Sequence, residues 1–142
     1  MEYFVVEPEV AGALGERTIM DREFHPPKVM NLHYVFDGWL GDAIVESFPV
    51  FLITEEAGHL LEDADVTGVL FAEAEIETSE QFIELYPGKR LPHFQWLRPA
   101  GIVGHDDVAT LTDGRLVLSK RVMDLLGSAG LKNALIEPLA IP

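Results

Sequence analysis

The stretch Leu70-Phe71-Ala72-Glu73-Ala74-Glu75-Ile76-Glu77 decides the class of fold, because it alternates apolar and acidic residues with a period of two. Successive side chains of a β-strand point to opposite faces, so this period predicts a strand. One face should carry Leu70, Ala72, Ala74 and Ile76. The other face carries what we define as the acidic stripe: Glu73, Glu75 and Glu77. We expect the strand to cover residues 66–77.

Three predicted helices each begin after a serine or threonine whose hydroxyl can cap the first turn. These N-caps are Thr54, Ser79 and Ser119, and the second of them belongs to a capping box. Helical spacing places Leu60 on the inner face of the first helix and Leu85 on that of the second. The helices are expected to be short.

Further strands are expected between these helices. Apolar runs bounded by turn residues mark them at 3–6, 32–36, 43–45, 50–53, 93–97, 108–111, 116–118 and 131–137, whereas 7–30 reads as irregular. Asp113-Gly114 predicts a hairpin turn between two of these runs. Because strands and helices interleave irregularly, we predict a single α+β domain over 1–142, with a mixed or mainly antiparallel sheet and about three short helices.

Composition excludes several classes of protein. The chain has 142 residues, 48% of them hydrophobic, which suits one compact domain and excludes intrinsic disorder. It contains no cysteine, so disulfides, thiolate metal sites and cysteine nucleophiles are excluded. No apolar run approaches the ~20 residues of a membrane helix, and Glu2 interrupts a signal-peptide pattern. We therefore expect a cytoplasmic protein that does not enter a membrane.

The charge is concentrated in the middle of the chain. The formal net charge is −14, and residues 29–88 hold 13 Asp and Glu with no Lys or Arg. Such a chain is a poor partner for nucleic acid, whose binding depends on Lys and Arg. A surface kept acidic only for solubility would intersperse the two signs. The block instead indicates a basic protein partner, through charge complementarity.

Motifs for catalysis or cofactor binding are absent from the sequence. It has no phosphate-binding loop, no G-x-G-x-x-G and no H-E-x-x-H. The one polar cluster is His105-Asp106-Asp107, which could hold a divalent cation or act as an acid/base pair. It follows Gly101 and Gly104, where aspartates serve turn formation, and we favour that structural interpretation. His25 and His33 are interpreted as packing or hydrogen-bonding residues.

Trp39 lies in a loop bracketed by glycines, with Asp37 before it and Asp42 after it. Tryptophan is enriched at binding hot spots, and loops carry function more often than scaffolds do. We therefore take Asp37, Trp39 and Asp42 as candidate partner contacts. The alternative is that Trp39 folds back over the core. The second tryptophan, Trp96, lies in an alternating strand and is predicted to be core.

The acidic stripe is the second candidate contact surface. Its three glutamates repel one another, and no Lys or Arg exists nearby in the sequence to pair with them. An exposed stripe would attract a cationic partner and speed association at low salt. Two alternatives remain at this point: pairing with Lys89, Arg90 or Arg98 from elsewhere in the fold, or protection of a sheet edge from aggregation.

Several segments resemble one known family. They are Tyr3-Phe4-Val5-Val6-Glu7-Pro8-Glu9, His25-Pro26-Pro27, Leu32-His33-Tyr34 with Asp37-Gly38-Trp39-Leu40-Gly41-Asp42, Thr78-Ser79-Glu80-Gln81-Phe82 with Tyr86-Pro87-Gly88, Leu91-Pro92, Phe94, Trp96-Leu97, Asp106-Asp107, and Leu116-Val117-Leu118-Ser119 through Val122, Leu125-Leu126 and Gly130-Leu131. The chain resembles the immunity proteins of bacterial polymorphic toxin systems. The group is the one named after a myxobacterial immunity protein and formerly catalogued as a domain of unknown function.

The resemblance implies a small α+β protein that binds and neutralises one cognate toxin domain, usually encoded by an adjacent gene. It implies no catalytic residue, cofactor or metal. We expect a toxin inhibitor in interbacterial competition, acting through Asp37, Trp39, Asp42, Glu73, Glu75 and Glu77 on a basic toxin domain. The alternatives are a regulatory or assembly domain, and a small metal-dependent hydrolase that uses His105, Asp106 and Asp107 with His25 or His33.

Overall fold

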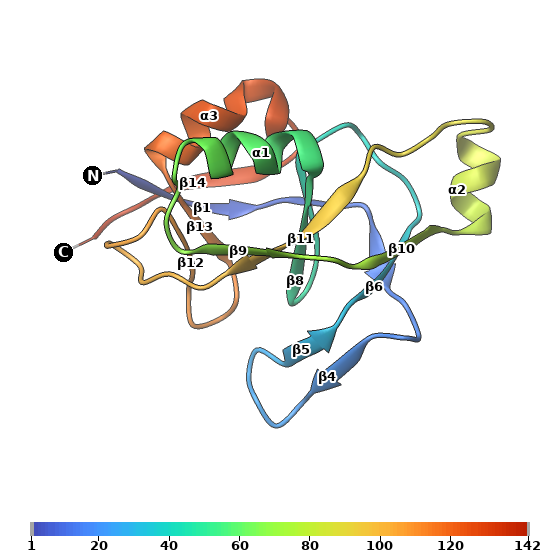
Figure 1. Ribbon diagram of the computed structural model, residues 1–142, viewed down its shortest axis with the longest axis horizontal. Helices are drawn as coiled ribbons and strands as arrows, with labels where there is room; N and C mark the ends of the chain where they lie inside the picture. The colour runs from blue at the N-terminus through green and yellow to red at the C-terminus, as the bar shows by residue number, and fades with distance from the viewer. Residues whose placement is uncertain (1, 142) are drawn as a thin grey trace.

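The computed structural model describes residues 2–141, which form fourteen strands and three helices in one α+β domain (Figure 1). The predicted fold class is confirmed. The elements are β1 Tyr3–Glu7, β2 Glu9–Val10, β3 Gly12–Leu14, β4 Ile19–Asp21, β5 Lys28–Asn31, β6 His33–Phe36, β7 Ile44–Ser47, β8 Val50–Thr54, α1 Glu55–Asp63, β9 Val69–Ala72, β10 Glu75–Thr78, α2 Glu80–Leu85, β11 Phe94–Pro99, β12 Val108–Thr110, β13 Leu116–Ser119, α3 Lys120–Gly130 and β14 Leu135–Leu139.

Two sheets enclose the main core beneath a pair of helices. One sheet has the order β12-β13-β1-β14 and the other β2-β7-β8-β11-β9. Helices α1 and α3 contact each other and lie together at the top of the molecule (Figure 1). Val6, Ile53, Leu61, Leu118 and Val122 from these elements pack into one cluster and are fully buried. The two helices and both sheets therefore share a single apolar interior.

A second, aromatic core lies under the small sheet β10-β6-β3. The ring of Phe36 lies 4.8 Å from that of Tyr34 and 5.0 Å from that of Phe94. Phe82 of α2 and Trp96 of β11 belong to the same cluster, and Trp96 is only 6% exposed. The prediction that Trp96 is a core residue is confirmed.

The prediction of one continuous strand at 66–77 is wrong. It is two strands in different sheets: β9 pairs antiparallel with β11, and β10 pairs parallel with β6. The chain changes partner between them, and Leu70 is 59% exposed, whereas the neighbouring Phe71 packs against the main core. The alternation thus also placed Leu70 on the wrong face. A period of two carries no information on which strand lies alongside, so it could not indicate the change of partner.

Residues 7–30 also differ from the expectation, because they contain four short strands rather than irregular chain. Strands of two to four residues are too short to display a period. In β3, Gly12 lies so close to β6 that a Cβ atom would collide with the carbonyl group of Val35. Gly12 is thus what permits the two strands to approach.

The predicted helix starts are confirmed at all three positions. The hydroxyls of Thr54, Ser79 and Ser119 each accept a hydrogen bond from a backbone N–H in the first turn of the following helix. The inward positions of Leu60 and Leu85 are wrong, since both side chains are exposed. Among residues 2–141, no helix has the length and apolar character that a membrane crossing requires.

Candidate partner-binding surface

The acidic stripe is exposed, but part of its charge is compensated. Arg17, from the loop between β3 and β4, places its Nε 2.5 Å from Oε2 of Glu75 and its guanidinium 3.3 Å from Oε1 of Glu77. This hydrogen bond, with the charge of Arg17, lowers the pKa of Glu75 against the opposing effect of burial. The compensating cation is thus Arg17, and not the residues 89, 90 or 98 that sequence position suggested.

The stripe remains negative after this pairing. Arg17 also lies 3.5 Å from Glu16, so one positive charge faces the four negative charges of Glu16 and the stripe, a net charge of −3. Within residues 2–141, Glu73 has no ion-pair partner. An exposed group of this charge attracts cations over a distance of about 8–10 Å at physiological salt.

The buried His33 contacts the acidic stripe through Glu77. Its side chain is almost fully buried, and its Nδ1 accepts a hydrogen bond from the backbone N–H of Arg17. Its Nε2 lies 2.5 Å from Oε1 of Glu77 and therefore donates the proton there. The prediction that His33 is a hydrogen-bonding residue is confirmed. Its position fixes where the Glu77 carboxylate stands.

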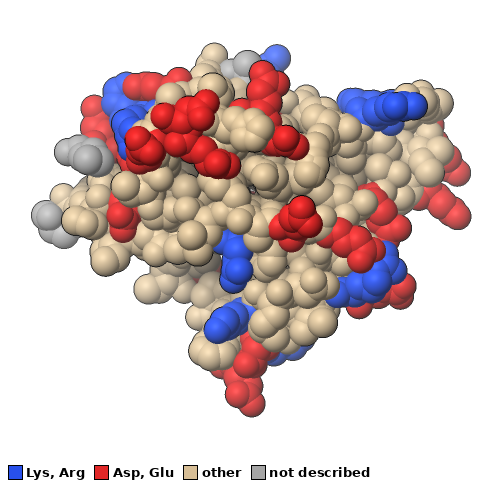
Figure 2. Space-filling model, in the orientation of Figure 1, with Lys and Arg blue, Asp and Glu red and all other residues tan. Residues whose placement is uncertain are grey.

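Helix α1 forms a second negative surface. Its sequence has Glu55 and Glu56 in the first turn, Glu62 and Asp63 at its end, and no Lys or Arg. Red atoms accordingly cover the region of α1 in Figure 2, on the same face as the acidic atoms that run toward β10. Carboxylates at the first turn suit the helix dipole, whereas carboxylates at the last turn oppose it. The helix dipole therefore does not explain Glu62 and Asp63.

Trp39 lies beside the first turn of α1 and folds partly over the aromatic core. Its Nε1 donates to the carbonyl oxygen of Asp42 at 3.0 Å, and its ring meets the ring of Phe94 edge-on at 5.6 Å. The ammonium of Lys89 lies 5.3 Å from the Trp39 ring and 4.7 Å from the Tyr86 ring. Trp39 is half-buried, so the folded-back alternative describes its main contacts.

The other two loop residues behave differently from the prediction. Asp42 is 1% exposed, and its carboxylate accepts hydrogen bonds from the backbone N–H and the side-chain amide of Asn133 at 2.8 and 2.9 Å. A partner cannot reach it, so we correct its role: Asp42 holds the loop to the segment after α3. Asp37 is half-buried and lines a hollow, where its side chain stays reachable.

A large hollow borders one side of Trp39, with a volume of about 740 Å³. Glu55 stands in its wall between two histidines, 3.0 Å from Nδ1 of His93 and 3.9 Å from Nε2 of His59. Leu60, 45% exposed, also lines it. Sequence reasoning missed His59 and His93. The four-residue spacing of Glu55 and His59 along one helix could have indicated that these two side chains are close, but no local pattern indicates His93.

A second hollow of about 370 Å³ lies on the other side of Trp39 and contains an unusual glutamate. Glu9 is 8% exposed; its Oε2 accepts from the backbone N–H of Leu40 at 2.7 Å, and its Oε1 has no hydrogen-bond partner. Burial raises the pKa of Glu9, although the bond from Leu40 opposes this. The exposed side chains of Val10, Leu40 and Leu85 form an apolar rim around the hollow.

The cluster at His105-Asp106-Asp107 is part of the scaffold. Asp107 is buried, and its carboxylate accepts hydrogen bonds from Arg121 at 2.6 Å, from Ser119 at 2.7 Å and from the backbone N–H of Thr67 at 3.0 Å. Asp106 closes a turn by accepting from the N–H of Ile102. Over the described range 2–141, no three His, Asp or Glu side chains are placed to hold a metal ion.

Comparison of the chain with protein-family models and with curated proteins finds no match. The surface around Trp39 combines the carboxylates at the first turn of α1 with two hollows and an apolar rim.

Proposed function

We propose that this protein is an immunity protein: it binds and neutralises a cognate bacterial toxin domain in the cytoplasm through its acidic surface, without catalysis of its own. One observation carries the proposal. The carboxylates of α1 and of the acidic stripe form a negative face that includes groups without an internal partner, and this face adjoins a half-buried tryptophan between two hollows. The resemblance of the sequence to immunity proteins supports the same function.

The charges of this face support a basic partner. Like charges held on a folded scaffold repel one another, and a cationic surface relieves this repulsion when it docks. Glu62 and Asp63 sit where the helix dipole disfavours them, and the stripe keeps a net charge of −3 with Glu16 and Arg17.

The apolar groups support a specific complex rather than a diffuse attraction. Hot spots combine buried aromatic anchors with a polar rim, and Trp39 with the exposed Leu40, Leu60 and Leu85 offers such groups beside both hollows. A toxin domain that acts on nucleic acid carries a positive substrate groove. The acidic face suits such a groove by imitating phosphate, and its occupation would block the toxin.

The proposal is tested with the product of the adjacent gene. The tagged protein is mixed with that product at low and high salt, and complex formation and the association rate are measured. We expect a one-to-one complex whose association rate falls as salt rises. If the product of the adjacent gene is folded but binds at neither salt concentration, the proposal is contradicted.

Charge-reversal variants locate the contact. The α1 variant carries Glu56→Lys, Glu62→Lys and Asp63→Lys, and within the described residues these side chains form no ion pair. We expect association at low salt to slow by about tenfold or more and its salt dependence to flatten. Thermal unfolding confirms that the variant is folded.

A matched control separates local charge from net charge. Glu2→Lys, Glu23→Lys and Glu137→Lys change the net charge by the same amount, and within the described residues these side chains also form no ion pair. All three positions lie outside the acidic block at residues 29–88. This control should associate clearly faster than the α1 variant. Equal rates for the two triple variants would remove α1 from the binding surface.

A further inference from the structure

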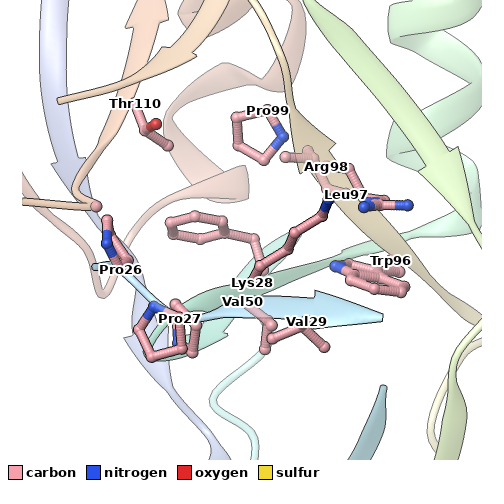
Figure 3. A pocket seen from close by; sticks show the side chains of 13 residues that line it. Pro26, Pro27, Lys28, Val29, Val50, Trp96, Leu97, Arg98, Pro99 and Thr110 are labelled. Carbon is pink, nitrogen blue, oxygen red and sulfur yellow. The ribbon is translucent and has the colours of Figure 1, made fainter. Parts of the chain in front are cut away.

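A third hollow has the opposite electrostatic character and plays no part in the proposed toxin surface. It has a volume of about 210 Å³ and lies where four separate parts of the chain meet (Figure 3). Its walls come from the β4–β5 hairpin, the start of β8, strand β11 and the β12–β13 hairpin.

Rigid apolar residues form part of the walls of this hollow. Four of the lining residues are prolines, which have no side-chain rotamers to lose on binding, and the buried Phe51 and Trp96 form its floor. Gly114 has a φ of +93°, and a Cβ atom there would lie 2.9 Å from Cγ of Pro26. The glycine thus lets the β12–β13 turn close against the proline wall, which preforms the hollow.

Two cations border these apolar walls without a carboxylate to neutralise them. The guanidinium carbon of Arg98 lies 4.5 Å from the centroid of the Trp96 ring, and this stacking holds it in place. Lys28 enters from β5, and Figure 3 shows its side chain extended toward the strand that bears Arg98. Among residues 2–141, neither cation forms an ion pair, in a chain where acidic groups outnumber basic ones by 24 to 10.

We propose that this hollow binds a small organic oxyanion, a carboxylate or a phosphate ester carried on a compact apolar body. Two positive charges at one hollow repel each other, and an oxyanion between them relieves the repulsion. The guanidinium fork matches the geometry of carboxylate and phosphate oxygens, and the proline and aromatic walls accept the apolar part. The volume holds about seven water-sized groups, which suits a ligand of that size.

Trp96 provides the readout for a direct test. The chain has two tryptophans, so the Trp39→Phe variant leaves Trp96 as the sole indole, with Arg98 stacked on it. The emission of Trp96 is titrated with benzoate, phenyl phosphate, inorganic phosphate and the uncharged benzamide. We expect a saturable change with benzoate or phenyl phosphate below 10 mM and none with benzamide. Whichever of benzoate and phenyl phosphate binds more tightly identifies the oxyanion. Weaker binding of inorganic phosphate than of phenyl phosphate confirms that the apolar part of the ligand contributes.

Charge removal in the same background completes the test. Lys28→Gln and Arg98→Gln should each weaken binding by about tenfold, whereas Lys132→Gln removes an exposed cation outside the hollow and should leave the affinity unchanged. Since Arg98→Gln also alters the surroundings of Trp96, its affinity is measured by calorimetry. No saturable response to either aromatic anion at 10 mM, or equal affinity in Lys28→Gln and Lys132→Gln, overturns the proposal. Neither result bears on toxin binding.

Discussion

The buried His33 ring holds Glu77 in place, with Nε2 of His33 2.5 Å from Oε1 of the glutamate. Nδ1 of His33 accepts a hydrogen bond from the backbone N–H of Arg17. The guanidinium of the same arginine contacts Glu75 and Glu77 at the surface. One arginine therefore supports the stripe both through its backbone and through its side chain. The geometry of the acidic stripe is set by residues far from it in the sequence.

Removal of the Arg17 charge should speed binding of a basic partner. Arg17→Gln keeps the backbone N–H that bonds to His33 but leaves Glu75 and Glu77 without their cation. We expect the association rate at low salt to rise by about two- to threefold, because the stripe becomes more negative. Stopped-flow mixing with the partner measures it. Lys132→Gln makes the same change in net charge elsewhere, and an equal gain in that control would contradict the prediction.

Trp39 should act mainly on the lifetime of the complex. Trp39→Ala removes the ring between the two hollows, and truncation of an aromatic hot spot costs about 2 kcal/mol or more of binding free energy. We expect faster dissociation with a nearly unchanged association rate, as measured by surface plasmon resonance. Leu135→Ala is the control, because that side chain is 69% exposed on β14 and lies apart from both hollows. A dissociation rate that stays at the wild-type value would exclude Trp39 as an anchor.

Asp107 should stabilise the fold above about pH 4. Burial alone would raise the pKa of Asp107, but hydrogen bonds from Arg121, Thr67 and Ser119 outweigh it and lower the pKa from 3.8 to about 2. Because the unfolded chain binds this proton more readily, the stabilisation is present above the unfolded pKa and is lost as pH falls through the folded one.

The Asp107→Asn variant tests this stabilisation. We expect the free energy of unfolding to fall by about 2–3 kcal/mol at pH 7 and the difference from wild type to shrink toward pH 2. Urea unfolding at pH 7, 4 and 2.5 measures both effects. Asp124→Asn, at an exposed position of α3, should change stability much less. A difference that stays constant over this pH range would refute the role of the ionised carboxylate.

Glu46 should have the opposite pH dependence. Burial, with a contribution from the nearby charge of Glu7, raises the pKa of Glu46 from 4.5 to about 7. The folded state therefore holds this proton more tightly than the unfolded chain, so stability falls as pH rises from about 4.5 to about 7. Glu46→Gln removes the titration and should be more stable than wild type by about 1–2 kcal/mol at pH 8, with little difference at pH 4.

Urea unfolding at pH 4 and pH 8 measures this difference. Glu84→Gln on α2 is the control, since its side chain is exposed and it should follow the wild-type pH profile. If Glu46→Gln also follows the wild-type profile, then Glu46 is not the group that titrates near neutral pH.

Local signals in the sequence predicted the features that depend on neighbouring residues. The capping hydroxyls of Thr54, Ser79 and Ser119 act within one helical turn, and the Asp113-Gly114 turn joins two adjacent strands. Trp96 follows the alternation of a single strand and is buried as expected. Each of these features involves residues a few positions apart, so pattern and propensity suffice.

The candidate site depended on contacts that no local pattern records. Arg17 reaches Glu75 across 58 positions, and Asp42 accepts hydrogen bonds from Asn133 across 91. The burial of Glu9 follows from the packing of the Trp39 loop over it. The sequence therefore predicted the charge of the surface correctly but could not identify which carboxylates the fold itself uses.

The position of Trp39 in the wall of both hollows has a thermodynamic consequence. The ring cannot shift without disturbing its hydrogen bond to Asp42 and its edge contact with Phe94, so one position of the indole serves both hollows at once. A group that enters one hollow and displaces the ring changes the affinity of the other, and by linkage the effect is equal in both directions. A ligand that moves this ring would therefore couple the two hollows energetically.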